Sequence, residues 1–156
     1  MHFAAVFSIS DSFKLNLANA SLNDVKVQKG KSMTAKAVLE KYKIEINSHE
    51  FDRLLPLISK ECQFWFTSGT YVGLDQTRKA FEKTWEMIKK EVYTISDLEW
   101  IAESEKAAVC IYTYHWSGLI DGQQQAGKGR GTSCFRKEVD GWKIVHEHLS
   151  AFPKVT

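Results

Sequence analysis

The chain has little of what marks membrane, nucleic-acid-binding or low-complexity proteins. Only two of its 156 residues are proline, and no apolar run approaches the roughly 18 residues that a membrane-spanning helix needs. Its 21 basic and 19 acidic residues nearly balance, and no Lys/Arg cluster is dense enough to follow a phosphate backbone. We therefore expect one globular domain that has neither nucleic acid nor a membrane as its partner.

Cysteine is also scarce. Cys62, Cys110 and Cys134 form no CxxC pair and are odd in number, so no disulfide framework is indicated. This usage favours a reducing, cytoplasmic location. Cys110 lies in an apolar run, where a small buried side chain is more common than a reactive thiol.

The first 32 residues match a secretory signal poorly, because no basic residue precedes the apolar run at 3–7 and no clear cleavage site follows it. Their pattern is weak up to Met33, where a strong helical pattern begins. We expect residues 1–32 to be an N-terminal extension, either disordered or a leader that is not natively translated. The functional domain would then span residues 33–156.

Helical spacing dominates the first half of this domain. Apolar residues at helical intervals over 34–48 predict one amphipathic helix. Residues 51–58 indicate a second, short helix that is bent or divided at Pro56. An aromatic strand at 62–66 follows, and then a third helix for which Asp75 is the expected cap.

The second half has the pattern of strands. The candidate strands are 93–101, 107–119, 124–137 and 142–152. The separators Asp121-Gly122 and Asp140-Gly141 are pairs typical of tight hairpins. Helices followed by a long antiparallel meander indicate the α+β class, in which one face of the sheet is covered by the helices.

Two local motifs carry a family resemblance. One is Tyr71-Val72-Gly73-Leu74-Asp75 at the start of the third helix, and the other is Asp140-Gly141-Trp142 followed by His146-Glu147-His148-Leu149-Ser150. With the element order, they resemble the nuclear transport factor 2 superfamily, especially its SnoaL-like and ketosteroid-isomerase-like members. The ending is also similar to the association (hub) domain of calcium/calmodulin-dependent protein kinase, whose last strand has Trp and then His-x-His-x-Ser. The resemblance covers about residues 33–152.

The resemblance implies a cone-shaped roll, in which three N-terminal helices pack in a highly curved, mostly antiparallel sheet. A pocket for a small-molecule ligand lies inside the cone, and the convex face of the sheet makes a homodimer. Alignment with the hub domain places His115 and Leu149 at two positions where that family has pocket arginines. The chain therefore departs from the acid-binding pattern of the hub.

Alternation along the last strand assigns its two faces. If Leu149 faces the pocket, Val145 and Glu147 face it too, and His146 and His148 point toward the interface, unless a bulge inverts the order.

The candidate catalytic pair is Glu147 with His115. A pocket carboxylate of raised pKa could act as a base with the histidine as its partner. The alternative is that Glu147 pairs with a neighbour and His115 only lines the pocket. The expected ligand-binding residues are Trp65, Tyr71, Trp85, Arg130 and Thr132. Core filling by the tryptophans is the more common alternative to ligand stacking.

His146 and His148 are the alternative pocket residues and a candidate metal pair. Two positions apart on a strand, their side chains are parallel and could hold zinc if a third ligand such as His115 reached them. The sequence shows no such third ligand, so we expect neither a metal nor a cofactor.

Three functional classes remain open at this stage. The first is a binding protein whose cone holds a small metabolite. The second is a cofactor-independent isomerase, lyase or hydrolase that acts on an apolar molecule. The third is a hub-like homo-oligomerisation module that uses the face of the sheet.

Overall fold

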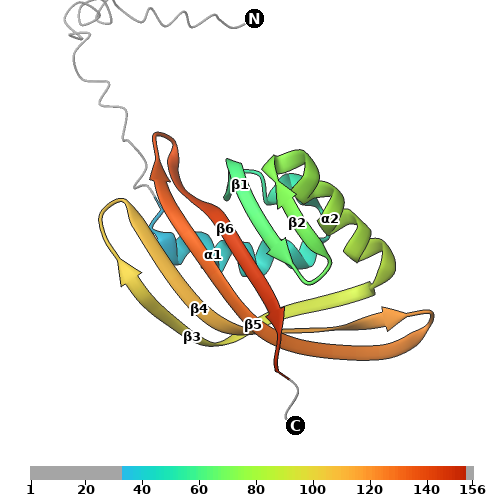
Figure 1. Ribbon diagram of the computed structural model, residues 1–156. Coiled ribbons are helices and arrows are strands. Elements are labelled where there is room, and N and C mark those ends of the chain that lie inside the picture. Colours follow the sequence, from blue (N-terminus) through green and yellow to red (C-terminus); the bar gives the residue numbers. More distant parts are fainter. Residues whose placement is uncertain (1–32, 154–156) are drawn as a thin grey trace, which may run out of the picture. The chain divides into compact units, whose positions relative to one another are not determined.

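The computed structural model describes residues 33–153, which form a six-stranded mixed sheet with two α-helices against one face (Figure 1). The α+β class is confirmed. The chain divides after Gly30, and every described residue belongs to the second unit. The N-terminal extension expected at residues 1–32 lies outside the described residues.

The sheet has the strand order β2-β1-β6-β5-β4-β3, in which β1 and β6 are parallel and all other neighbours are antiparallel. In chain order the elements are α1 (Ala35–Glu45), the 3₁₀ turns Ile46–Ser48 and Phe51–Arg53, β1 (Ile58–Phe66), β2 (Gly69–Val72), α2 (Gly73–Met87), β3 (Lys89–Glu103), β4 (Ala107–Ile120), β5 (Gln123–Glu138) and β6 (Gly141–Ala151).

The two helices begin in different ways. The Thr34 side chain caps α1 by accepting a hydrogen bond from the Ala37 amide at 3.2 Å. Helix α2 has no side-chain cap at Val72, so the expected capping by Asp75 is not found. Asp75 lies instead in the first turn, where its charge complements the helix dipole.

The second expected helix does not form. Residues 51–53 make a single 3₁₀ turn, and β1 begins at Ile58, before the strand that the sequence predicted. The Pro56 carbonyl accepts a hydrogen bond from Lys143 Nζ at 2.7 Å, which ties this segment to β6. Residues 33–153 therefore form two α-helices rather than three, and the expected strong curvature of the sheet is not confirmed.

The hydrophobic core lies between the helices and one face of the sheet, which we call the inner face. Its buried members include Val38, Leu39 and Tyr42 of α1, Phe81 and Trp85 of α2, and Tyr112, Phe135 and Ile144 of the sheet. Tyr42, Phe135 and Ile144 are at most 1% exposed. This packing buries the apolar stripe of each helix, which supplies the main free energy of folding.

A bulge in β6 sets which of its side chains point inward. The register with β5 shifts between the pairs Cys134–His146 and Phe135–Ile144. As a result Ile144, rather than Val145, is the fully buried residue, and Glu147 is buried three positions later. His146 and His148 lie on the opposite, outer face, against Trp65 of β1.

All three cysteines are free thiols, and Cys62 and Cys110 are buried. Burial raises the pKa of Cys110 to about 12, so this thiol is unreactive. Neither of the described helices is long and apolar enough to cross a membrane.

Candidate functional site

Glu147 is the one acidic side chain that is fully buried among the described residues, with 1% exposure. Tyr112 of β4 donates a hydrogen bond to its Oε1 at 2.8 Å, and Tyr42 of α1 donates to its Oε2 at 3.0 Å. The Tyr112 hydroxyl also lies 3.0 Å from Ser133 Oγ on β5. Three strands and one helix thus hold the carboxyl group in place, and the two tyrosines partly offset the cost of burying it.

This environment moves the titration of Glu147 into the neutral range. Burial raises its pKa from the usual 4.5 to about 7, while the hydrogen bonds from Tyr112 and Tyr42 act in the opposite direction. Burial and the charge of Glu147 also raise the pKa of both tyrosines well above 10. The tyrosines therefore remain neutral while Glu147 can either accept or release a proton near pH 7.

Glu147 lines a cavity of about 150 Å³ between the inner face and α2. Half of the residues that line it are aromatic, namely Phe66, Phe81, Trp85, Tyr93, Tyr114 and Trp116. The charged residues that line it are Glu91 and Glu147, and no Lys, Arg or His among the described residues does so. An apolar cavity with a few polar groups is the usual form of a small-molecule site.

The aromatic wall depends on glycines in the neighbouring strand. The opposed pairs are Tyr112–Gly131, Tyr114–Gly129 and Trp116–Gly127. A Cβ added at Gly131 would lie 2.1 Å from the Tyr112 ring, which is far inside van der Waals contact. The glycines thus make room for the rings to lie flat across β5, which positions the Tyr112 hydroxyl at Glu147.

Tyr93 of β3 presents an unpaired polar group at this cavity. Its side chain is 7% exposed and stacks on Tyr114 with ring centroids 6.2 Å apart. Its buried hydroxyl has no hydrogen-bond partner among the described residues. Burial, and next the charge of Glu147, raise the Tyr93 pKa well above 10. An unpaired buried hydroxyl costs about 1–3 kcal/mol, so a bound molecule that pairs with it would recover this free energy.

Glu91 is the second carboxyl group of the cavity. It is half-buried, and burial raises its pKa from 4.5 to about 7. Its backbone carbonyl accepts a hydrogen bond from His49 Nε2 at 3.0 Å, and the His49 ring stacks on Trp85. These contacts connect the end of the 3₁₀ turn Ile46–Ser48, helix α2 and the start of β3 around one side of the cavity.

The structure does not bring His115 to Glu147. On β4 the inward positions are those of Cys110 and Tyr112, so His115 lies on the outer face, with Nε2 2.8 Å from Ser96 Oγ. Its expected role as the partner of Glu147 has no geometric support.

Of the five residues expected in the ligand pocket, Trp85 alone lines the cavity. Arg130 and Thr132 line a hollow of about 440 Å³ on the outer face. Trp65 is on the outer face and 45% exposed. Tyr71 packs against Phe66, and its hydroxyl lies 2.9 Å from Ser68 Oγ.

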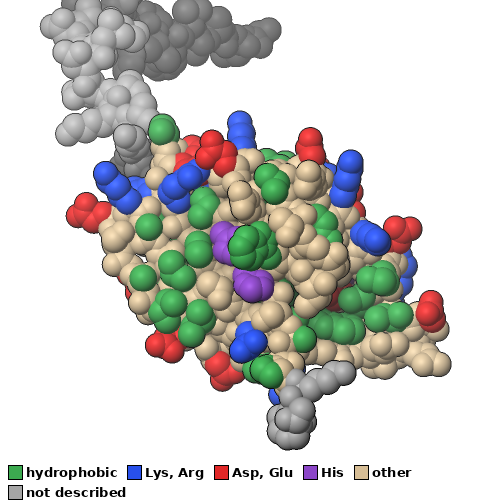
Figure 2. All heavy atoms as spheres, in the orientation of Figure 1, with side chains coloured by type: hydrophobic (Ala, Val, Ile, Leu, Met, Phe, Trp, Pro, Cys, Tyr) green, Lys and Arg blue, Asp and Glu red, His purple; other side chains and the backbone are tan. Residues whose placement is uncertain are grey.

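The outer face carries the two histidines of β6. Trp65 packs edge-on against both rings, with centroids 5.0 Å from His146 and 5.7 Å from His148. Figure 2 shows two histidine side chains beside a hydrophobic side chain in the middle of this face. His146 Nδ1 lies 2.6 Å from the Gln63 carbonyl, and no group of three potential metal ligands is found among residues 33–153.

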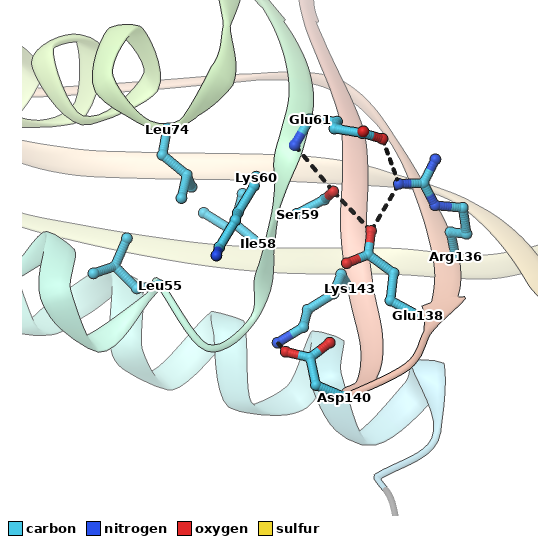
Figure 3. Close-up of a pocket in the computed structure, with 10 residues that line it drawn as sticks. All are labelled: Leu55, Ile58, Ser59, Lys60, Glu61, Leu74, Arg136, Glu138, Asp140 and Lys143. Atoms are coloured by element: carbon cyan, nitrogen blue, oxygen red, sulfur yellow. Dashed lines mark hydrogen bonds and ion pairs between the residues drawn. The ribbon is translucent and has the colours of Figure 1, made fainter.

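A larger hollow of about 500 Å³ lies near the β5–β6 hairpin (Figure 3). Arg136 contacts Glu61 at 3.0 Å and Glu138 at 2.8 Å, and Lys143 contacts Asp140 at 3.0 Å. Figure 3 shows these ion pairs beside the hollow, connecting β1, β5 and the hairpin. Because these charges already satisfy one another, we regard this network as bracing between strands rather than as the functional site.

Tyr42, Tyr112 and Glu91 were not among the site residues expected from the sequence. Tyr42 was placed in the apolar stripe of the first helix, where its hydroxyl gave no separate signal. Tyr112 shares its alternating face with Tyr114 and Trp116, and this run of large aromatic residues was the available signal for a wall of the site.

The family model of the SnoaL-like domain matches residues 35–154. No protein of curated function matches the sequence. A nuclear transport factor 2-like superfamily protein from Salmonella enterica is 23% identical with a TM-score of 0.70, over 76% of this chain and 89% of that one. The association domain of C. elegans CaMKII is 16% identical with a TM-score of 0.59, over 72% and 90% of the two chains. LinA is 13% identical with a TM-score of 0.65, over 77% and 88%. At these identities the likeness shows the fold alone.

Proposed function

The chain belongs to the SnoaL-like domain family, and on that basis we propose that it binds a small molecule with an apolar ring in the cavity at Glu147. The observation that carries the proposal is the combination of an aromatic wall with two buried polar groups. Phe66, Trp85 and Trp116 offer apolar contact, while Tyr93 and Glu147 offer hydrogen bonds that fix the orientation of a ligand.

The volume of the cavity limits the size of the occupant. An engineered cavity of about 150 Å³ in another protein accommodates benzene, and the cavity here has about the same volume. The ligand, or the part of it that enters, is therefore about one ring with a small substituent. A fused multi-ring molecule would have to extend beyond the cavity.

Binding of benzyl alcohol tests this proposal. We expect saturable changes in the NMR resonances of Trp85 and Trp116, which line the cavity. Leu149→Trp should abolish these changes by filling the space, whereas Ile111→Trp adds the same ring to the outer face and should preserve them. Circular dichroism of both variants checks their folding. Equal binding by a folded Leu149→Trp protein would contradict the proposal.

A second candidate function is cofactor-independent proton transfer by Glu147, in an isomerase, lyase or hydrolase reaction. It is favoured by a pKa of about 7 in a carboxyl group that lines a cavity. The test is exchange of the α-hydrogens of a cyclic ketone with deuterated solvent, followed by NMR. We expect wild-type protein to accelerate the exchange with an inflection near pH 7. A rate equal to that of Glu147→Gln would contradict catalysis by this group.

A third candidate function is homodimerisation through the outer face. Trp65 and Ile111 are 45% and 37% exposed there, and exposed apolar groups on a sheet face are typical of protein contacts. Trp65→Glu should convert a dimer to a monomer in analytical ultracentrifugation without changing the binding of benzyl alcohol. A monomeric wild-type protein would refute this assignment.

A further inference from the structure

We propose, taking the proposed small-molecule site as the basis, that the natural occupant is a small organic cation. The chemical class is a protonated amine attached to an apolar ring. Three independent features of the cavity support this class, namely its charge, its aromatic wall and its unpaired hydroxyl.

The charge of the cavity is of one sign. Glu91 and Glu147 line it, and none of the described residues that line it is Lys, Arg or His. The carboxylate of Glu91 has neither a hydrogen bond nor an ion pair among residues 33–153, and Glu147 accepts hydrogen bonds from the neutral hydroxyls of Tyr42 and Tyr112. An ammonium group would supply the missing countercharge, whereas an anionic ligand would be repelled by two carboxylates in a site of low dielectric constant.

The wall suits a cation as well as a ring. Trp85, Trp116, Tyr93 and Tyr114 line the same cavity, and aromatic faces attract ammonium groups through their electron-rich π systems. Cages of this type recognise quaternary ammonium ligands in other proteins. Here the carboxyl groups strengthen the same preference.

The Tyr93 hydroxyl is the third feature. It is buried, unpaired and part of the cavity lining. A hydroxyl oxygen accepts hydrogen bonds, so an N–H of a bound ammonium can pair with it. A primary amine in this cavity could therefore contact Tyr93 and a carboxylate at the same time.

Three probes that share one ring test the charge preference, namely benzylamine, benzyl alcohol and benzoate. At pH 8, titration calorimetry should show benzylamine binding about ten times more tightly than benzyl alcohol, with benzoate weaker than both. Equal affinities, or tighter binding of the alcohol or of benzoate, would overturn the cation assignment and leave the proposed site intact. Failure of all three probes to bind would overturn the site itself and the cation assignment with it.

A pair of matched variants locates the countercharge. Glu91→Gln should weaken benzylamine binding about tenfold and leave benzyl alcohol within about twofold, because the change removes charge but keeps shape. Glu105→Gln, an exposed substitution between β3 and β4, should alter neither affinity. An equal loss for both probes in Glu91→Gln, or no loss for either, would overturn the role of this carboxylate.

Discussion

Glu147→Gln should make the protein more stable above neutral pH, although it replaces a residue at the centre of the candidate site. The side chain is buried between Tyr42 and Tyr112, and each tyrosine hydroxyl can donate or accept a hydrogen bond. A glutamine amide therefore fits between them without leaving an unpaired group. The substitution removes the free-energy cost of burying an ionised carboxylate away from water.

The magnitude follows from the pKa of Glu147. Because the pKa is about 7 in the folded protein and 4.5 in the unfolded chain, the folded state binds more protons between these values. The free energy of unfolding therefore falls as pH rises from 4.5 to 7. This difference between the folded and unfolded pKa lowers the free energy of unfolding by about 3 kcal/mol once the carboxyl group is ionised. Glutamine does not ionise, so the variant loses no stability in this way. Its free energy of unfolding should equal that of wild type near pH 4.5 and exceed it by about 3 kcal/mol at pH 8.

Urea unfolding at several pH values between 4.5 and 8 measures this difference. Glu91→Gln is the matched control, because the pKa of Glu91 is also raised to about 7 while this residue is only half-buried. At pH 8 Glu91→Gln should also raise the free energy of unfolding, but by less than Glu147→Gln does. A stability difference between Glu147→Gln and wild type that does not change with pH, or a variant that is less stable at pH 8, would refute the reasoning.

The remaining predictions concern the support of this carboxyl group. Gly131→Ala should lower the free energy of unfolding by about 1–3 kcal/mol in urea melts, because the added Cβ collides with the Tyr112 ring; wild-type stability would contradict the contact. Tyr42→Phe should cost about 1–3 kcal/mol in the same assay at pH 8, since one Glu147 oxygen loses its donor. Tyr93→Phe should instead match or exceed wild-type stability, because its hydroxyl is unpaired, while benzylamine binding weakens; a marked loss of stability would reveal a partner for that hydroxyl.

Local patterns in the sequence predicted much of the fold. Alternation identified the long strands, and the Asp121-Gly122 pair predicted a hairpin whose two residues have φ values of 51° and 76°. The resemblance to the nuclear transport factor 2 superfamily is confirmed by the SnoaL-like match over residues 35–154. These features are local, so the order of residues along the chain is enough to show them.

The site was less predictable because its contacts join distant parts of the chain. The hydrogen bond from Tyr42 to Glu147 spans 105 positions, and helical spacing alone explains Tyr42 as a core residue. The parallel pairing of β1 with β6 is similarly distant, and it extends β1 into the segment that was expected to be helical.

The alternation of residue types also failed to predict which face of β5 points inward, because several inward positions of that strand are glycines. On β5 the inward residues include Gly129 and Gly131, so no large apolar side chain marked that face in the sequence. Arg130 and Thr132, which were expected in the pocket with His115 and Glu147, lie on the outer face. Each of these glycines lies opposite an aromatic residue of β4, but the sequence does not show which residue this is until the register of the two strands is known.

The most direct test of the central claim is a crystal structure with a brominated benzyl alcohol soaked in, located by the anomalous signal of bromine. We predict one peak between α2 and the inner face, beside Trp85 and within contact of Tyr93 or Glu147. A peak in the hollow near Lys143, a peak on the outer face beside Arg130, or an empty cavity at saturating probe would contradict the claim.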